Sequence, residues 1–193
     1  MGEQLMLFDK HEFKSERLTY EYFFLISPPE IIKNAIKELK KKLNAQVNLS
    51  IENLHSIAHI SLFKCLINSK NEKYVMLITD AVLRGVNAFN IKLNGHLIFE
   101  HGSTRSLVIK IDEAEQINKI NNMLAKGFKV KNFEITPHIT IARSLKINDI
   151  NKISDNLSEY NFEGEFFCTE ITILRKEAGS QDKYVIFHKM LLS

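Results

Sequence analysis

Cysteine is scarce in this chain. The only two, Cys65 and Cys168, lie far apart and form no C-x-x-C pattern. Their spacing argues against a disulfide framework and against a zinc site, both of which need cysteines or other ligands in close groups. We therefore expect two buried thiols in a protein of a reducing compartment.

Long apolar runs and flexible linkers are also missing. No stretch approaches the length of a bilayer span, and residues 1–10 carry acids and no long apolar run, unlike a signal peptide. The chain has only three prolines and seven glycines, and no Pro-, Gly- or Ser-rich segment divides it. We expect a cytoplasmic monomer with no membrane partner. It should fold as a single two-lobed domain over residues 1–193, with residues 1–17 as a loose N-terminal extension.

Neither sign of charge dominates the chain. The 26 basic and 23 acidic residues leave a formal net charge of +3. A balance this close to zero does not predict a protein that coats nucleic acid, although it permits a locally basic groove. A hydrophobic share of 45% with 25% charged residues is typical of a globular protein.

One short pattern occurs twice. The segments Ala58-His59-Ile60-Ser61-Leu62 and Pro137-His138-Ile139-Thr140-Ile141 both read histidine, apolar, hydroxyl, apolar. Successive side chains of a strand point to opposite faces, so each segment presents an imidazole and a hydroxyl together. A third match, His101-Gly102-Ser103, lacks the apolar alternation and lies in a predicted hairpin turn. Two such strands facing each other would suit acid–base chemistry on a phosphate ester.

Hydrophobic periodicity predicts strands that alternate with helices. The expected strands are Leu18–Ile26, Ala58–Phe63, Phe89–Phe99, Ser106–Ile111, His138–Ala142, Phe162–Leu174 and Tyr184–Leu191. The expected helices are Ile31–Leu43, Glu72–Leu83, Asp112–Leu124, which Gly127 closes, and Ile147–Leu157. This order predicts an α+β fold, a bilobal duplicated β-α-β sandwich with two antiparallel-rich sheets facing a central cleft and helices on the outer faces. One motif falls in each half of the chain, so a pseudo-twofold axis would relate the two motifs.

The motif segments, AHISLF and TPHITIAR, resemble the signatures of the two-histidine (2H) phosphoesterase superfamily. They are most similar to its bacterial 2'-5' RNA ligase branch, also described as RNA 2',3'-cyclic phosphodiesterases. The second segment matches the family pattern Pro-His-x-Thr-x-x-Arg at all four fixed positions, Pro137, His138, Thr140 and Arg143. In the first segment Ser61 stands where threonine is more usual, and serine also donates a hydrogen bond. The order of elements fits as well, so the resemblance spans Leu18 to Leu192.

The resemblance implies a bilobal fold with both histidines in a central cleft and with no metal or other cofactor. It implies a reaction that opens a 2',3'-cyclic phosphate at an RNA 3' end to a 2'-phosphomonoester. Some members also join, or reversibly cleave, RNA with a 2'-5' linkage.

The residues themselves are consistent with this chemistry. Opening a cyclic phosphodiester requires a deprotonated water on one side of phosphorus and a protonated 3' oxygen on the other. An imidazole titrates near 6.5 and can do either task. We therefore take His59 and His138 as the catalytic pair, with the acid and the base unassigned. The hydroxyls of Ser61 and Thr140 can reach the non-bridging phosphate oxygens.

Two cations and three aromatic residues are further candidates. Arg143 could offset the charge of the phosphorane, or form a surface salt bridge. Strict alternation sets Arg143 on the face opposite His138, so we expect it past the end of the strand. Lys64 could bind substrate, or be a solvated lysine. Tyr20, Tyr22 and Phe99 could stack on a nucleobase, although core packing is the better interpretation of Phe99.

Two other functions remain open at this stage. The chain could hydrolyse small cyclic phosphates, such as cyclic mononucleotides or ADP-ribose 1'',2''-cyclic phosphate. It could also be a non-catalytic module of the same fold that binds RNA ends without turnover. Both histidines are present, which argues against the module.

Overall fold

A computed structural model describes residues 18–131 and 134–193. The extension expected over residues 1–17 lies outside these ranges. The strands are β1 (Thr19–Ile26), β2 (Ile60–Asn68), β3 (Phe89–His101), β4 (Thr104–Asp112), β5 (His138–Lys146), β6 (Glu163–Cys168), β7 (Glu170–Glu177) and β8 (Val185–Leu191). The helices are α2 (Glu30–Gln46), α3 (Ile51–His55), α4 (Glu72–Leu83), α5 (Glu115–Gly127) and α6 (Ile147–Ile153), with 3-10 turns at Ser69–Asn71 and Ser154–Tyr160.

The strands form one sheet in the order β6-β3-β4-β5-β2-β1-β7-β8, and neighbouring strands are antiparallel. Two four-stranded halves meet where β5 lies beside β2. The ladder at that junction holds one residue pair, Ile60 with Ile139. The α+β, two-lobed fold is therefore as predicted, and the two expected sheets are joined through this pair.

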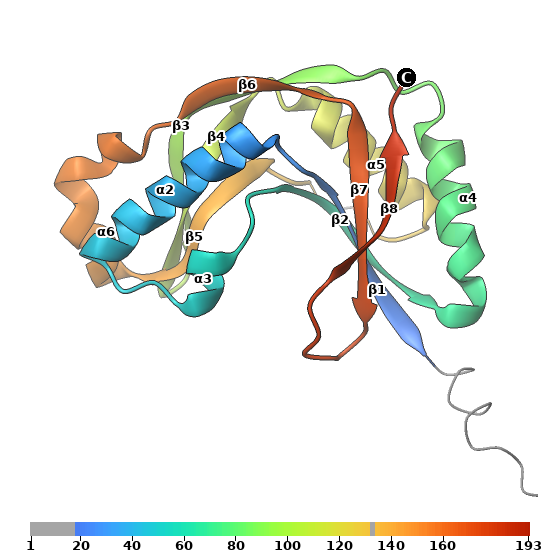
Figure 1. Ribbon diagram of the computed structural model, residues 1–193, viewed down its shortest axis with the longest axis horizontal. Helices are drawn as coiled ribbons and strands as arrows, with labels where there is room; N and C mark the ends of the chain where they lie inside the picture. The colour runs from blue at the N-terminus through green and yellow to red at the C-terminus, as the bar shows by residue number, and fades with distance from the viewer. Residues whose placement is uncertain (1–17, 132–133) are drawn as a thin grey trace, which may run out of the picture.

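The two halves of the sheet are not the two halves of the chain. The strands near the chain ends, β1, β2, β7 and β8, build one half, and β3 to β6 build the other. The single strand predicted over Phe162–Leu174 is wrong, because it is two strands broken at Thr169. Strand β6 pairs with β3 at one edge, and β7 pairs with β1 in the other half. Figure 1 shows β6 crossing the top of the molecule and the chain then turning down into β7.

Each half carries its own helices on its outer side (Figure 1). Helices α4 and α5 pack on the half that contains β2, and α2, α3 and α6 pack on the half that contains β5. Gly127 ends α5 as predicted. A Cβ at this position would lie 2.5 Å from Cγ2 of Val82 on α4, so the glycine also permits the two helices to approach closely.

Cys65 and Cys168 are buried free thiols, as the sequence predicted. Burial raises the pKa of each thiol to about 12, so both stay protonated and unreactive near neutral pH. None of the helices in the described ranges is long and apolar enough to cross a lipid bilayer.

Candidate active site

The residue pair that joins the two halves lies inside both histidine motifs. Ile60 and Ile139 face each other and are fully buried, with 0% of each side chain exposed. Counting outward along antiparallel strands sets His59 opposite Thr140 and Ser61 opposite His138, on the face turned away from the core. The two imidazoles are therefore diagonal neighbours, about 7 Å apart at Cβ in a regular ladder.

Both imidazoles are held in the same tautomer. Nδ1 of His59 lies 2.9 Å from the carbonyl oxygen of Ile57, and Nδ1 of His138 lies 2.7 Å from that of Thr136. A carbonyl oxygen only accepts hydrogen bonds, so Nδ1 carries the hydrogen in each ring. The Nε2 atoms are then left to exchange protons with a ligand.

A phenylalanine packs edge-on against each catalytic candidate. The ring centroid of Phe23 lies 5.4 Å from that of His59, and the ring centroid of Phe99 lies 4.9 Å from that of His138. Phe99 is only partly buried, lies outside the hydrophobic core and contacts His138, so its interpretation as a core residue is wrong. Tyr22 is fully buried and its hydroxyl donates to Glu72 at 2.8 Å, so it is a core residue and cannot stack on a base.

The surroundings lower the pKa of both histidines. Burial is the main cause for each, and it outweighs the hydrogen bond that the ring donates to a backbone carbonyl, which raises the pKa. The charges of Lys40, Arg143 and His138 lower the pKa of His59 further, and the charge of His101 does the same for His138. Both imidazoles are therefore neutral near pH 7 in the free protein, and a bound phosphate anion would favour protonation of one of them.

A β-bulge follows the hydroxyl residue in each motif strand. In β2, Ser61 and Phe63 pair with successive residues of β1, so Leu62 is the extra residue. In β5, Thr140 and Ala142 pair with successive residues of β4, so Ile141 is the extra residue. Two consecutive side chains are buried at each bulge, and the alternation of faces is reset beyond it.

The bulges bring a cation back to the face of the histidines in both strands. Arg143 follows the bulge of β5, inside a strand that continues to Lys146. Our expectation that Arg143 lies past the strand end is therefore wrong. The charge of the Arg143 guanidinium is close enough to His59 to lower the pKa of that histidine. Lys64 occupies the equivalent position in β2. It is paired with Phe23 in the ladder and so shares the face on which Phe23 contacts His59.

A buried lysine and an asparagine brace the segment before His59. Nζ of Lys40, a residue that is 1% exposed, donates to the carbonyl oxygens of Asn53 at 3.1 Å and Ser56 at 2.7 Å, and to Oγ of Ser56 at 2.5 Å. The Asn53 side chain accepts from the backbone N–H of Arg143 at 2.9 Å and donates to its carbonyl oxygen at 2.8 Å. This Lys40–Asn53 clamp connects α2 and α3 to the motif strand β5. Burial, followed by the charge of Arg143, lowers the pKa of Lys40 to about 8.

The structure thus gathers the four motif residues on one face, with Arg143 beside His59. Lys64 lies on the same face, but its ammonium is bonded to Glu21 and Tyr184. Sequence reasoning missed Phe23 and the Lys40–Asn53 clamp, because their roles depend on which segments are neighbours in space. Within the described ranges, no three His, Cys, Asp or Glu side chains form a group that could hold a metal ion.

Comparisons with known proteins identify a family and a shared fold. The sequence profile of the 2'-5' RNA ligase superfamily matches residues 28–180. No curated protein is significantly similar in sequence. The crystal structure of TT0787 of Thermus thermophilus superimposes with a TM-score of 0.67 at 16% identity, over 89% of this chain and 97% of that one. E. coli LigT complexed with 3'-AMP gives 0.66 at 18% identity, over 91% and 99%.

A more distant neighbour is Kluyveromyces marxianus Usb1 with uridine monophosphate, with a TM-score of 0.57 and 14% identity over 92% of this chain and 100% of that one. At such identities these likenesses concern the fold. The family profile, in contrast, covers most of the chain and includes both histidine motifs. The chain therefore belongs to the 2'-5' RNA ligase superfamily of 2H phosphoesterases.

Proposed function

We propose that this protein opens 2',3'-cyclic phosphates at RNA 3' ends to 2'-phosphomonoesters by metal-independent acid–base catalysis. The observation that carries this proposal is the pairing of His59 and His138 across the Ile60–Ile139 junction, each with Nδ1 on a carbonyl and Nε2 left for a ligand. Two imidazoles at diagonal positions of adjacent strands can serve the two sides of an in-line displacement.

The reaction would proceed as follows. One neutral imidazole takes a proton from water as the water oxygen bonds to phosphorus. The bond from phosphorus to the 3' oxygen breaks, and the other imidazole, protonated, gives its proton to that oxygen. The product is a 2'-phosphomonoester and a free 3'-hydroxyl. If the 5'-hydroxyl of a second RNA replaces water, the same transfers produce a 2'-5' linkage, and their reversal cleaves it.

Neighbouring side chains would stabilise the phosphorane. The hydroxyls of Ser61 and Thr140 share the face of the imidazoles and can donate to the non-bridging oxygens. The guanidinium of Arg143 lies near His59 and would offset the developing negative charge. LigT and Usb1 have been crystallised with nucleoside monophosphates, which supports a nucleotide as the unit that this fold accepts.

The deciding experiment is a turnover assay with EDTA present, on RNA that ends in a 2',3'-cyclic phosphate. We expect a 2'-phosphomonoester as product and no loss of rate with EDTA. A 3'-phosphomonoester, or a rate abolished by EDTA, would contradict the proposed chemistry. Parallel reactions with cyclic mononucleotides and with ADP-ribose 1'',2''-cyclic phosphate test the small-molecule alternative. Tight binding of RNA ends without any product would identify a binding module.

A further inference from the structure

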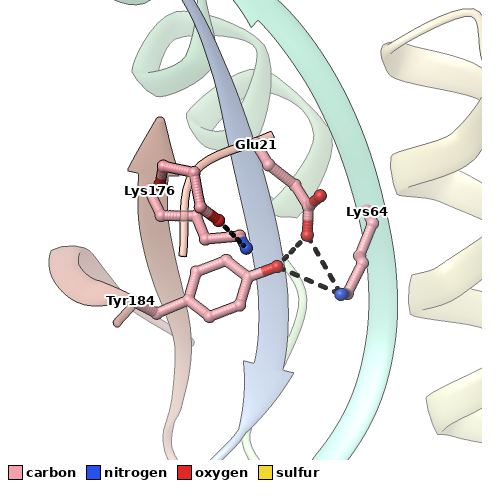
Figure 2. Close-up of polar contacts among 5 residues, drawn as sticks. Glu21, Lys64, Lys176 and Tyr184 are labelled. Atoms are coloured by element: carbon pink, nitrogen blue, oxygen red, sulfur yellow. Dashed lines mark hydrogen bonds and ion pairs between the residues drawn. The ribbon is translucent and has the colours of Figure 1, made fainter. Parts of the chain in front are cut away.

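Figure 2 shows four side chains that lie close together, Glu21 on β1, Lys64 on β2, Lys176 on β7 and Tyr184 just before β8. Nζ of Lys64 lies 3.0 Å from Oε1 of Glu21 and 3.0 Å from the hydroxyl of Tyr184. The Tyr184 hydroxyl also donates to Glu21. Nζ of Lys176 donates to the carbonyl oxygen of Ser180 at 3.2 Å and lies 5.3 Å from the centroid of the Tyr184 ring. We name Glu21, Lys64, Lys176 and Tyr184 the Lys64 cluster.

The Lys64 cluster is continuous with the active site. Nζ of Lys64 lies 4.7 Å from the centroid of the Phe23 ring, and the same ring packs against the imidazole of His59. The bulge in β2 gives Lys64 the position that Arg143 has in β5. Arg143, however, lies near His59, whereas Lys64 is held back by Glu21 and Tyr184. The cluster is therefore placed beside the reacting phosphate instead of on it.

The Lys64 ammonium keeps capacity for a ligand. An ammonium has three N–H donors, and two are used by Glu21 and Tyr184 within the described structure. The Lys64 side chain remains 53% exposed. Glu21 and Tyr184 fix the ammonium in one place, so a ligand that binds there would order few additional side chains.

The cluster also makes the two sides of the cleft electrostatically unequal. Within the described residues, Lys64 pairs with the carboxylate of Glu21, whereas the ammonium of Lys176 lies 5.3 Å from the Tyr184 ring centroid and bonds a backbone carbonyl instead of a carboxylate. In the half of the sheet that contains His138, the cations of β3 and β4 pair one to one with carboxylates of the same two strands or of Glu113, which follows β4. These pairs are Lys110 with Asp112 at 2.8 Å, Arg105 with Glu100 at 3.3 Å and Lys92 with Glu113 at 3.4 Å. The excess positive charge therefore lies on the side of His59.

We propose that the Lys64 cluster is a subsite for the internucleotide phosphate next to the terminal one, so that the RNA chain leaves the active site across β2 and β1 toward Tyr184. The substrate class is then an oligonucleotide end and not a cyclic mononucleotide. This inference rests on the proposed function, because it assigns the terminal phosphate to the histidines. A fixed cation with a free donor suits a backbone phosphate, which every RNA sequence presents.

Binding measurements on the whole protein test the subsite without requiring turnover. The probes are a trinucleotide with a 3'-phosphate and a nucleoside 3'-monophosphate, titrated into the wild type and Lys64→Met by calorimetry. We expect the variant to bind the trinucleotide about tenfold more weakly and the mononucleotide unchanged. The slope of log Kd against log salt for the trinucleotide should fall by about 0.7, the value for one lost phosphate contact on a single strand. Lys64→Arg should retain most of the affinity.

Lys189→Met is the matched control. Lys189 forms an ion pair with Glu170, and the two side chains are 51% and 26% exposed, against 53% and 25% for Lys64 and Glu21. Lys189 lies on β8, at the edge of the same half, so its loss should change the affinity for neither the trinucleotide nor the mononucleotide.

Two results would overturn the subsite. If Lys64→Met weakens the binding of both ligands equally, Lys64 contacts the terminal phosphate. If it weakens the binding of neither ligand, Lys64 contacts no phosphate. If the wild type opens no cyclic phosphate while the length-dependent loss persists, the proposed function fails and the subsite stands.

Discussion

Each catalytic candidate is fixed by the same two contacts, a carbonyl at Nδ1 and a phenylalanine edge against the ring. We therefore expect His59→Ala and His138→Ala each to lower kcat for cyclic-phosphate opening by about 10² to 10⁴, the usual contribution of a positioned acid or base. His55→Ala, at an exposed position four residues before His59, should retain the wild-type rate. Single-turnover kinetics measure the rate of the chemical step, and thermal melts confirm that each variant is folded. A histidine variant that is folded and fully active would remove that residue from the mechanism.

The lowered pKa values of His59 and His138 also set the pH dependence. Activity requires one imidazole neutral and the other protonated, so the rate follows the singly protonated pair and the profile is bell-shaped. In the free protein both pKa values lie below the ordinary 6.5. The maximum of kcat/KM should therefore lie below about pH 6.5. The maximum of kcat should lie at higher pH, because a bound phosphate anion raises the pKa of both rings. A kcat/KM maximum well above pH 7 would contradict this assignment.

At the level of single residues, much of the site could be predicted from the sequence. The alternation of His59 with Ser61, and of His138 with Thr140, already sets each pair on one face. Arg143 was misplaced because alternation assumes a regular ladder, and a bulge is decided by the register with the neighbouring strand. The role of Phe23 was not predicted for a related reason. Its contact with His59 depends on the pairing of β1 with β2, which periodicity along one segment cannot give.

Among the secondary-structure elements, α3 is the one that sequence reasoning did not foresee between Leu43 and Ala58. It has only five residues, Ile51–His55, and so gives too short a stretch for helical periodicity to appear. Tertiary contacts hold it in place. Ser50 accepts from the N–H of Asn53 at its start, and the Lys40–Asn53 clamp ties it to α2 and β5.

The clamp predicts that Asn53 matters although it does not face the cleft. Asn53→Ala removes both side-chain partners of the Arg143 backbone, and leaving such groups unpaired costs about 1 to 3 kcal/mol. We expect that loss in urea unfolding, together with a drop in kcat/KM of about tenfold at a temperature where the variant is fully folded, because Arg143 is no longer held beside His59. Asn87→Ala, at an exposed position after α4, is the control. Lower stability with an unchanged kcat/KM would show that the clamp serves only the fold.

For the molecule as a whole, the sequence predicted the class of fold and the presence of one motif per lobe, but not how the chain divides between the lobes. Periodicity suggested two consecutive halves. Instead β7 and β8 return to β1, and the middle of the chain forms the other lobe. Pairing between distant strands leaves no pattern in the local sequence. Periodicity therefore predicted one continuous strand where the chain changes its pairing partner at Thr169. One consequence is that the cleft depends on closure of the entire chain, because each lobe supplies one histidine.

The buried charge of Lys40 should appear in the stability of the whole protein. Its pKa of about 8 in the fold lies below the value of about 10.4 in the unfolded chain. Between these values the unfolded chain binds more protons, so the free energy of unfolding rises with pH. The contribution of Lys40 to the free energy of unfolding is complete above about pH 10.4 and is lost as the pH falls through 8, with a total of about 3 kcal/mol.

We expect urea unfolding to show wild-type stability rising across this window relative to Lys40→Met, which is neutral at every pH. Lys37→Met, an exposed position on α2, should follow the wild type. A constant difference between wild type and Lys40→Met would mean that folding does not shift the pKa of Lys40.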